Sequence, residues 1–339
     1  MRHRLKDVAE RAGVSVKTVS NVVNGYAHVR PDTRARVEEA IAALNYRPNL
    51  SARNLRKGRT GIIALAVPEL DIPYFAELAR HVVSAAAELG WTVLIDQTGG
   101  GREQERVVAS GITDHLIDGL IFSPLALTAD DLVNLDGTPM VLLGERVDRG
   151  PADHVVIDNV AAAREITNHL VGLGRRRIAA IGSQRTPEGA SARLRLDGYR
   201  SALAEAGLGY DEALVAPAPV WHRADGAAAM RHLLASGVRP DAVFCFNDTL
   251  ALGALRALHE TGLRVPEDVA VAGFDGIEDG RFSVPTLTTI APDKERIARL
   301  AVELLANRIE GDRSAPPREL AAPYRLEPRE STQGRQPHP

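Results

Sequence analysis

The stretch LKDVAERAGVSVKTVSNVVNG, which runs from Leu5 to Gly25, decides how the N-terminal end of this chain folds. Its first half places apolar residues at helical spacing, at Leu5, Val8, Ala9 and Ala12. Gly13 predicts the end of that helix, and Ser15 is a natural N-cap for the next one. The second half again sets apolar residues on one face, at Val16, Val19, Val22 and Val23. Two short helices separated by about three residues predict a helix-turn-helix, whose second helix would enter the major groove of DNA.

A third helix completes the predicted unit. Pro31 marks its first turn, and it ends before Asn45 and Tyr46. The residues expected to form the shared core are Val8, Val19, Val37, Ile41 and Leu44. The other side chains of the second helix are not needed for this core and can contact DNA. Several are short hydroxyl residues suited to phosphates or base edges. We predict DNA contacts from Ser15, Val16, Lys17, Thr18, Ser20, Asn21 and Asn24.

The charge distribution favours a polyanionic partner at the same end. Residues 1–60 contain 13 Lys and Arg against 5 Asp and Glu, whereas the rest of the chain contains 28 against 39. A basic stretch can also be an ordinary solvated surface, so the charge supports the motif without deciding the matter alone.

The following stretch, YRPNLSARNLRKG from Tyr46 to Gly58, places a leucine among basic residues. An isolated helix of about nine residues does not persist in water, so this stretch is expected to fold only on a partner. An inert polar linker is the alternative reading, but a linker has no need of Leu55 flanked by basic side chains.

These motifs, in this order and spacing, resemble the LacI/GalR (lactose/galactose repressor) family of bacterial transcription regulators. The matching segments are DVAERAGVS (7–15), TVSNVVN (18–24) and YRPNLSARNL (46–55), and further matches extend to about Pro328. The resemblance implies a hinge helix that forms on operator DNA and inserts Leu55 into the minor groove. It also implies DNA contacts from Tyr46, Asn49, Ala52, Arg53, Leu55, Arg56 and Lys57.

Three positions depart from the family pattern. Arg4 and Arg30 stand where family members usually cap their first and third helices with Thr or Ser. Each missing cap is expected to cost about 1 kcal/mol of headpiece stability. Gly144 stands where relatives often have Asp, which makes the identity of their ligand less transferable to this chain.

Beyond Thr60 the chain alternates short apolar runs with helical segments. The predicted strands are GIIALAVP (61–68), WTVLIDQT (91–98), GLIFSP (119–124), MVLLGE (140–145), HVVIDN (154–159), RIAAIG (177–182), AVFCFND (242–248) and VAVAGFD (269–275), and a helix is predicted over 74–89. Such alternation predicts parallel sheets covered by helices, and its length requires two similar subdomains. The fold class is therefore an all-α headpiece followed by α/β, with two doubly wound parallel-sheet subdomains. The resemblance implies that these are of periplasmic-binding-protein type.

The expected domain limits follow from these elements. They are a headpiece at 1–47, a hinge at 48–59, an effector-binding and dimerisation domain at 60–327, and a disordered tail at 328–339. Within the large domain, the N-subdomain is expected at about 60–158 and 289–318, and the C-subdomain at about 159–288 and 319–327.

Ligands of such folds bind at the carboxyl ends of the strands. The resemblance implies that Arg195 and Asp275 form a charged pair that holds ligand hydroxyls, with Trp221 as an aromatic wall. The full set of implied effector residues is Tyr74, Phe75, Ser123, Glu145, Arg195, Trp221, Asn247 and Asp275. Structural ion pairs are the alternative, and for Ser123 and Glu145 this alternative has equal weight.

The function expected is a ligand-responsive repressor that binds a palindromic operator as a homodimer, because one headpiece offers few base contacts. A sugar is the favoured effector; a corepressor such as a nucleobase is the alternative.

An enzyme is disfavoured for two reasons. GLGRRR (172–177) follows a predicted helix and precedes a predicted strand, which is the reverse of the order around a dinucleotide-binding loop, and HExxH and GxSxG motifs are missing. Cys245 is the single cysteine, so a cysteine-cluster zinc site is excluded, and we expect no cofactor and no metal. No apolar run is long enough to cross a membrane and no secretory signal is evident, so we expect a cytoplasmic protein that joins the nucleoid through DNA.

Overall fold

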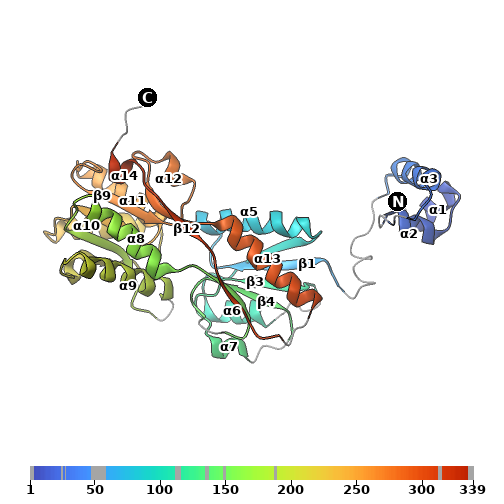
Figure 1. Ribbon diagram of the computed structural model, residues 1–339, viewed down its shortest axis with the longest axis horizontal. Coiled ribbons are helices and arrows are strands. Elements are labelled where there is room, and N and C mark those ends of the chain that lie inside the picture. Colours follow the sequence, from blue (N-terminus) through green and yellow to red (C-terminus); the bar gives the residue numbers. More distant parts are fainter. Residues whose placement is uncertain are drawn as a thin grey trace. The chain divides into compact units, whose positions relative to one another are not determined.

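The computed structural model describes residues 4–23, 26, 28–46, 59–110, 116–133, 137–147, 150–186, 189–311 and 315–334. The chain divides into two units, Met1–Gly61 and Ile62–Pro339 (Figure 1). The predicted hinge falls almost entirely outside the described residues, as do Asn24, Asn49, Ala52, Arg53, Leu55, Arg56 and Lys57.

The described part of the first unit contains three helices, as predicted: α1 (Leu5–Ala12), α2 (Val16–Val23) and α3 (Pro31–Ala43). Val8, Val19 and Val37, one from each helix, are fully buried and hold the unit together. Gly13 ends α1 with a φ of 64°, in the left-handed region that favours glycine. Ser15 caps α2, because its Oγ accepts a hydrogen bond of 3.1 Å from the Thr18 backbone N–H.

The second unit begins with a six-stranded parallel sheet, in the order β11-β5-β4-β3-β1-β2. Its strands are β1 (Ile62–Val67), β2 (Thr92–Gln97), β3 (Gly119–Phe122), β4 (Met140–Leu143), β5 (Asp153–Val156) and β11 (Glu319–Ala321). The helices of this lobe are α5 (Pro73–Glu88), α6 (Arg102–Ala109), α7 (Ala129–Val133) and α13 (Lys294–Glu310). Figure 1 shows α5 and α13 side by side, and the core they share with the sheet includes Leu65 and Leu305. We call this part the N-lobe.

The second sheet has the order β12-β10-β9-β8-β6-β7 and is parallel except for β12, which pairs antiparallel with β10. Its strands are β6 (Ile178–Ser183), β7 (Val215–Pro217), β8 (Ala242–Cys245), β9 (Ala270–Phe274), β10 (Thr288–Pro292) and β12 (Tyr324–Glu327). Its helices are α8 (Asn159–Gly172), α9 (Ala190–Glu205), η1 (Glu212–Leu214), α10 (Arg223–Ala235), α11 (Asp248–Glu260), α12 (Asp279–Phe282) and α14 (Glu330–Gln333). We call this part the C-lobe.

The chain crosses between the lobes three times, between β5 and α8, between β10 and α13, and between β11 and β12. Two predicted limits are wrong in detail. Residues 289–292 belong to the C-lobe, because β10 pairs with β9, and residues 319–321 belong to the N-lobe, because β11 pairs with β5. A three-residue strand such as β11 carries too little periodicity for its sheet to be read from the sequence.

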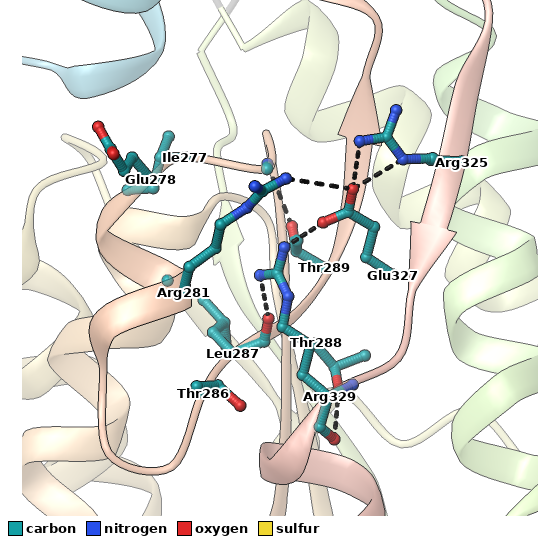
Figure 2. A network of polar contacts seen from close by, with 12 residues as sticks. Ile277, Glu278, Arg281, Thr286, Leu287, Thr288, Thr289, Arg325, Glu327 and Arg329 are labelled. Atoms are coloured by element: carbon teal, nitrogen blue, oxygen red, sulfur yellow. Dashed lines mark hydrogen bonds and ion pairs between the residues drawn. The ribbon is translucent and has the colours of Figure 1, made fainter.

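The prediction of a disordered tail is wrong for residues 328–334. Ser331 is fully buried on the C-lobe, where its Oγ donates to the Val271 carbonyl at 2.6 Å and accepts from the Thr288 N–H at 2.8 Å. Four residues earlier, the Glu327 carboxylate forms ion pairs with the guanidinium groups of Arg281, Arg325 and Arg329 (Figure 2). Polar contacts of this kind leave no apolar pattern in a sequence. Residues 335–339 lie outside the described part of the chain.

None of the described helices is both long enough and apolar enough to cross a lipid bilayer.

Candidate effector site and DNA-binding helix

A cavity of about 400 Å³ lies between the two lobes at the carboxyl ends of their strands. Its N-lobe wall includes the residues after β1, β2, β3 and β4, and its C-lobe wall includes α9 and the residues after β6, β7, β8 and β9. The structure places all eight sequence-predicted effector residues on this wall: Tyr74, Phe75, Ser123, Glu145, Arg195, Trp221, Asn247 and Asp275. A shared place on a cavity wall is the arrangement that a small polar ligand requires.

Arg195, on α9, is fixed by two hydrogen bonds and by two aromatic rings. Its Nε donates to Asn159 Oδ1 at 2.7 Å, and its Nη1 donates to the Phe246 carbonyl. The guanidinium lies over the Phe274 ring, 3.6 Å from its centroid, and within 5.2 Å of the Trp221 ring centroid. These contacts fix the orientation of the guanidinium fork. Burial lowers the pKa of Arg195, although the nearby carboxylates oppose that effect.

Asp275 follows β9 and lies 3.7 Å from Arg195, measured from Oδ1 to Nη1. Burial raises the pKa of the Asp275 carboxyl to about 6, despite the opposing attraction of Arg195 and Lys294. Its backbone has a φ of 112°, which a residue with a Cβ adopts only at a cost in strain. The Lys294 ammonium fixes this loop by donating to the backbone carbonyls of Asp275 at 2.5 Å and Gly276 at 2.9 Å.

Trp221, the predicted aromatic wall, is held in place by hydrogen bonds from its ring and its backbone. Its Nε1–H donates to the Gly182 carbonyl at 3.0 Å, and its carbonyl accepts from Asn247 Nδ2 at 3.1 Å. Asn247 also caps α11, because its Oδ1 accepts from the Leu250 N–H at 2.8 Å. One asparagine therefore joins the start of a helix to the wall of the cavity.

Three predicted residues of the N-lobe make different kinds of contact. Glu145 spans the cavity, because its Oε2 accepts from Ser191 Oγ of the C-lobe at 2.9 Å while its Oε1 accepts from the Ile157 N–H at 3.3 Å. Tyr74 and Phe75 lie at the start of α5 with their ring centroids 5.3 Å apart. Burial and the nearby carboxylates raise the pKa of Tyr74, so the phenol stays neutral and can donate a hydrogen bond.

Sequence reasoning missed several residues of the cavity wall. Ser191, Glu69 and His222 line it, and His222 Nε2 lies 2.6 Å from Glu69 Oε2 across the lobes. Glu69 and His222 are 153 residues apart in the chain, and neither belongs to a spacing motif, so no local signal marked them.

On the first unit, α2 presents the predicted recognition side chains. Val16 is 44% exposed and Lys17 is exposed, whereas Thr18, Ser20 and Asn21 are half-buried. Tyr46 is only 8% exposed and packs in the headpiece core, and its DNA contact stays a prediction. Tyr46 lies three residues after the end of α3, and its N–H donates to the Ile41 carbonyl at 2.9 Å, which turns the chain back onto the core.

A sequence profile described as "Bacterial regulatory proteins, lacI family" matches residues 4–49, and one described as "Periplasmic binding protein-like domain" matches residues 167–332. The HTH-type transcriptional regulator CelR of Thermobifida fusca is 38% identical over 329 residues, 94% of this chain and 95% of the relative. The chain belongs to the lacI family of bacterial regulatory proteins.

Two solved lacI-family structures extend the likeness to the fold. A structure described as a transcriptional regulator CelR–cellobiose complex has 34% identity and a TM-score of 0.72, and the match covers 97% of this chain and all of that one. A lac repressor dimer bound to operator and the anti-inducer ONPF has 30% identity and a TM-score of 0.81, over 98% of this chain and 99% of that one. The headpiece and both lobes are thus those of a lacI-family regulator.

Proposed function

We propose that this chain is a transcriptional repressor, not an enzyme, that binds a palindromic operator as a homodimer and changes its DNA affinity when a small molecule fills the cavity between the lobes. The observation that carries the proposal is the cavity itself, whose walls come from two lobes of a chain that also bears a helix-turn-helix. A ligand that contacts both lobes binds one arrangement of them better than another, and so shifts their equilibrium. The site of action that follows is the cytoplasm, where operator DNA is found.

The DNA contacts rest on α2. Lys17 supplies a charge near phosphates, while Val16 and Asn21 are suited to base edges. The hinge residues, with Leu55 as the minor-groove wedge, remain predictions from sequence. An operator can be selected from random duplexes and its affinity measured as salt is raised. A steep loss of affinity supports the proposal, whereas an affinity that is flat with salt contradicts a DNA role.

The homodimer has a candidate surface on the N-lobe. β2 is an edge strand, and Leu94 and Ile95 on it are each 44% exposed. An exposed apolar edge strand is a liability in a monomer, and a second copy of this chain would cover it. Sedimentation of Leu94→Arg should then show a shift from dimer toward monomer, and an unchanged dimer would remove this surface from the proposal.

The effector is best explained as a polar, hydroxyl-rich molecule such as a sugar. Arg195, Asp275 and Asn247 offer charged and amide groups, and Trp221 offers a flat face for an apolar sugar surface. The CelR structure that resembles this chain contains cellobiose, which supports a saccharide. A flat nucleobase that stacks on Trp221 is the second candidate, because the same amide and charged groups could read its edge.

A thermal-shift screen of sugars and nucleosides separates these candidates. A ligand at about 100 times its dissociation constant stabilises the folded chain by about 2.7 kcal/mol. Arg195→Lys keeps the charge but loses the planar fork, and should abolish the shift. Arg296→Lys, an exposed change on α13, is the matched control. If Arg195→Lys keeps the full response, Arg195 does not belong to the site.

A further inference from the structure

Three side chains outside the predicted effector set lie close together at the wall of the cavity. They are Glu69 and Asp71, in the connection between β1 and α5, and His222, directly before α10. One ligating atom of each lies within 4.8 Å of the other two, and His222 Nε2 is 2.6 Å from Glu69 Oε2. Glu69 and His222 also line the cavity.

The three residues come from opposite lobes. Glu69 and Asp71 belong to the N-lobe and His222 to the C-lobe, so any group that holds all three also holds the lobes together. The side chains of His222 and Glu69 are 37% and 29% exposed, which leaves them within reach of an ion from solvent.

The charges of this cluster are not balanced. A hydrogen-bonded latch between lobes needs only Glu69 and His222, yet the Asp71 carboxylate lies beside them. Asp71 is exposed, and among the described residues it makes no hydrogen bond or ion pair. Two carboxylates this close repel each other, and even a protonated imidazole leaves one negative charge in excess. A divalent cation would offset both carboxylates at once.

We propose that Glu69, Asp71 and His222 bind a divalent transition-metal cation of the Zn²⁺ class that bridges the two lobes at the cavity wall. An imidazole nitrogen with two carboxylate oxygens is a ligand set that suits zinc and similar metals, whereas Mg²⁺ and Ca²⁺ prefer oxygen ligands alone. At ligand distances of about 2.0–2.2 Å, two ligand atoms of one ion lie at most about 4.4 Å apart. Binding would therefore draw the Asp71 carboxylate inward and separate His222 Nε2 from Glu69 Oε2, which lie 2.6 Å apart in the structure. Three protein ligands leave one tetrahedral position open for water or an oxygen of a molecule in the cavity.

Calorimetric titration of Zn²⁺ into the full-length, tag-free chain tests the site. The expected result is one bound ion per chain, with affinity reduced about tenfold or more in His222→Gln and in Asp71→Asn. The matched controls are His232→Gln on α10 and Glu103→Gln on α6, both exposed changes away from the cluster. The control variants should bind Zn²⁺ as the parent chain does.

Substitution with Co²⁺ adds a readout of the ligands, because its visible absorption reports coordination. We expect a spectrum that the His222→Gln chain loses, and no competition from equal concentrations of Mg²⁺ or Ca²⁺. Failure to bind Zn²⁺ at micromolar concentration would overturn the proposal, as would equal binding by the cluster variants and the controls. A melting curve for each variant shows that the fold is intact.

The cation should also strengthen effector binding, because both ligands favour lobes that are held together. This last step rests on the proposed function, whereas the titrations contain neither DNA nor effector. The metal site can therefore fail while the regulatory role holds, and the reverse outcome is equally distinguishable.

Discussion

Asp275→Asn is expected to stabilise the second unit, although it removes a charge from the effector site. The reason lies in the environment of the carboxyl, which is buried and has its pKa raised from 3.8 to about 6. A raised pKa means that the folded protein holds the ionised form less well than water does. An asparagine has nearly the same shape and nothing to ionise.

The magnitude and its pH dependence follow from linkage. Between pH of about 4 and 6, the unfolded chain has released this proton while the folded chain retains it, so stability falls as pH rises through that window. Above the folded pKa the loss is complete and amounts to about 3 kcal/mol, since one pKa unit corresponds to about 1.4 kcal/mol. Asp275→Asn should therefore be more stable than the parent by about 3 kcal/mol near pH 8, and by about half of that near pH 5.

Urea denaturation followed by tryptophan fluorescence measures this difference, because Trp91 and Trp221 both belong to the second unit. Protein concentration is held fixed, since dimerisation also stabilises the fold. Asp130→Asn, an exposed change, is the control and should shift stability little at either pH. If Asp275→Asn is equally stable or less stable near pH 8, the ionised carboxylate is well solvated or well paired and the reasoning is refuted.

Three further predictions concern other parts of the chain. Lys17→Ala should weaken binding to all duplexes and lower the salt slope of binding by about one, as measured by anisotropy titrations. Glu105→Gln should cost about 2 kcal/mol in urea denaturation while Glu103→Gln costs little, because the buried Glu105 carboxylate accepts three backbone N–H bonds of 2.7–2.9 Å. Deletion of residues 328–339 should lower the melting temperature of the second unit, because it removes the buried hydrogen bonds of Ser331; an unchanged melting curve would show that the segment is dispensable.

The sequence predicted the elements whose patterns are local. The headpiece helices follow from apolar spacing with Gly13 and Ser15 as their stops and caps, and the eight predicted strands of the lobes follow from continuous apolar runs. β7, β10, β11 and β12 were not predicted as strands. β10 is buried along its length yet begins with Thr288 and Thr289, whose hydroxyls find partners from distant segments.

The cavity shows the same division between local and distant information. Its eight predicted residues came from positional likeness to a family, since no spacing rule brings together residues on seven separate segments. Tyr46 was matched in the same way, and the structure adds that its side chain packs in the headpiece core. Contacts between the lobes, such as Glu145 with Ser191, depend on tertiary structure and had no signal in the chain.

Asp275 and Arg195 in the cavity are held in conformations or environments that lower the stability of the fold. This cost suggests how a ligand bound in the cavity could change the affinity for DNA. Asp275 combines backbone strain with a raised pKa, and Arg195 is buried with its pKa lowered. Asp275 is also tied through its carbonyl to Lys294, the first residue of α13, whose Nζ lies 3.0 Å from Glu77 Oε2 on α5. Asp275, whose carboxyl would contact an effector, is therefore hydrogen-bonded to a residue at the crossing between β10 and α13. A ligand that hydrogen-bonds to the buried Asp275 carboxylate would therefore also affect α13, which follows one of the crossings between the lobes. Such a ligand would bind one arrangement of the lobes more tightly than another, as a population shift requires.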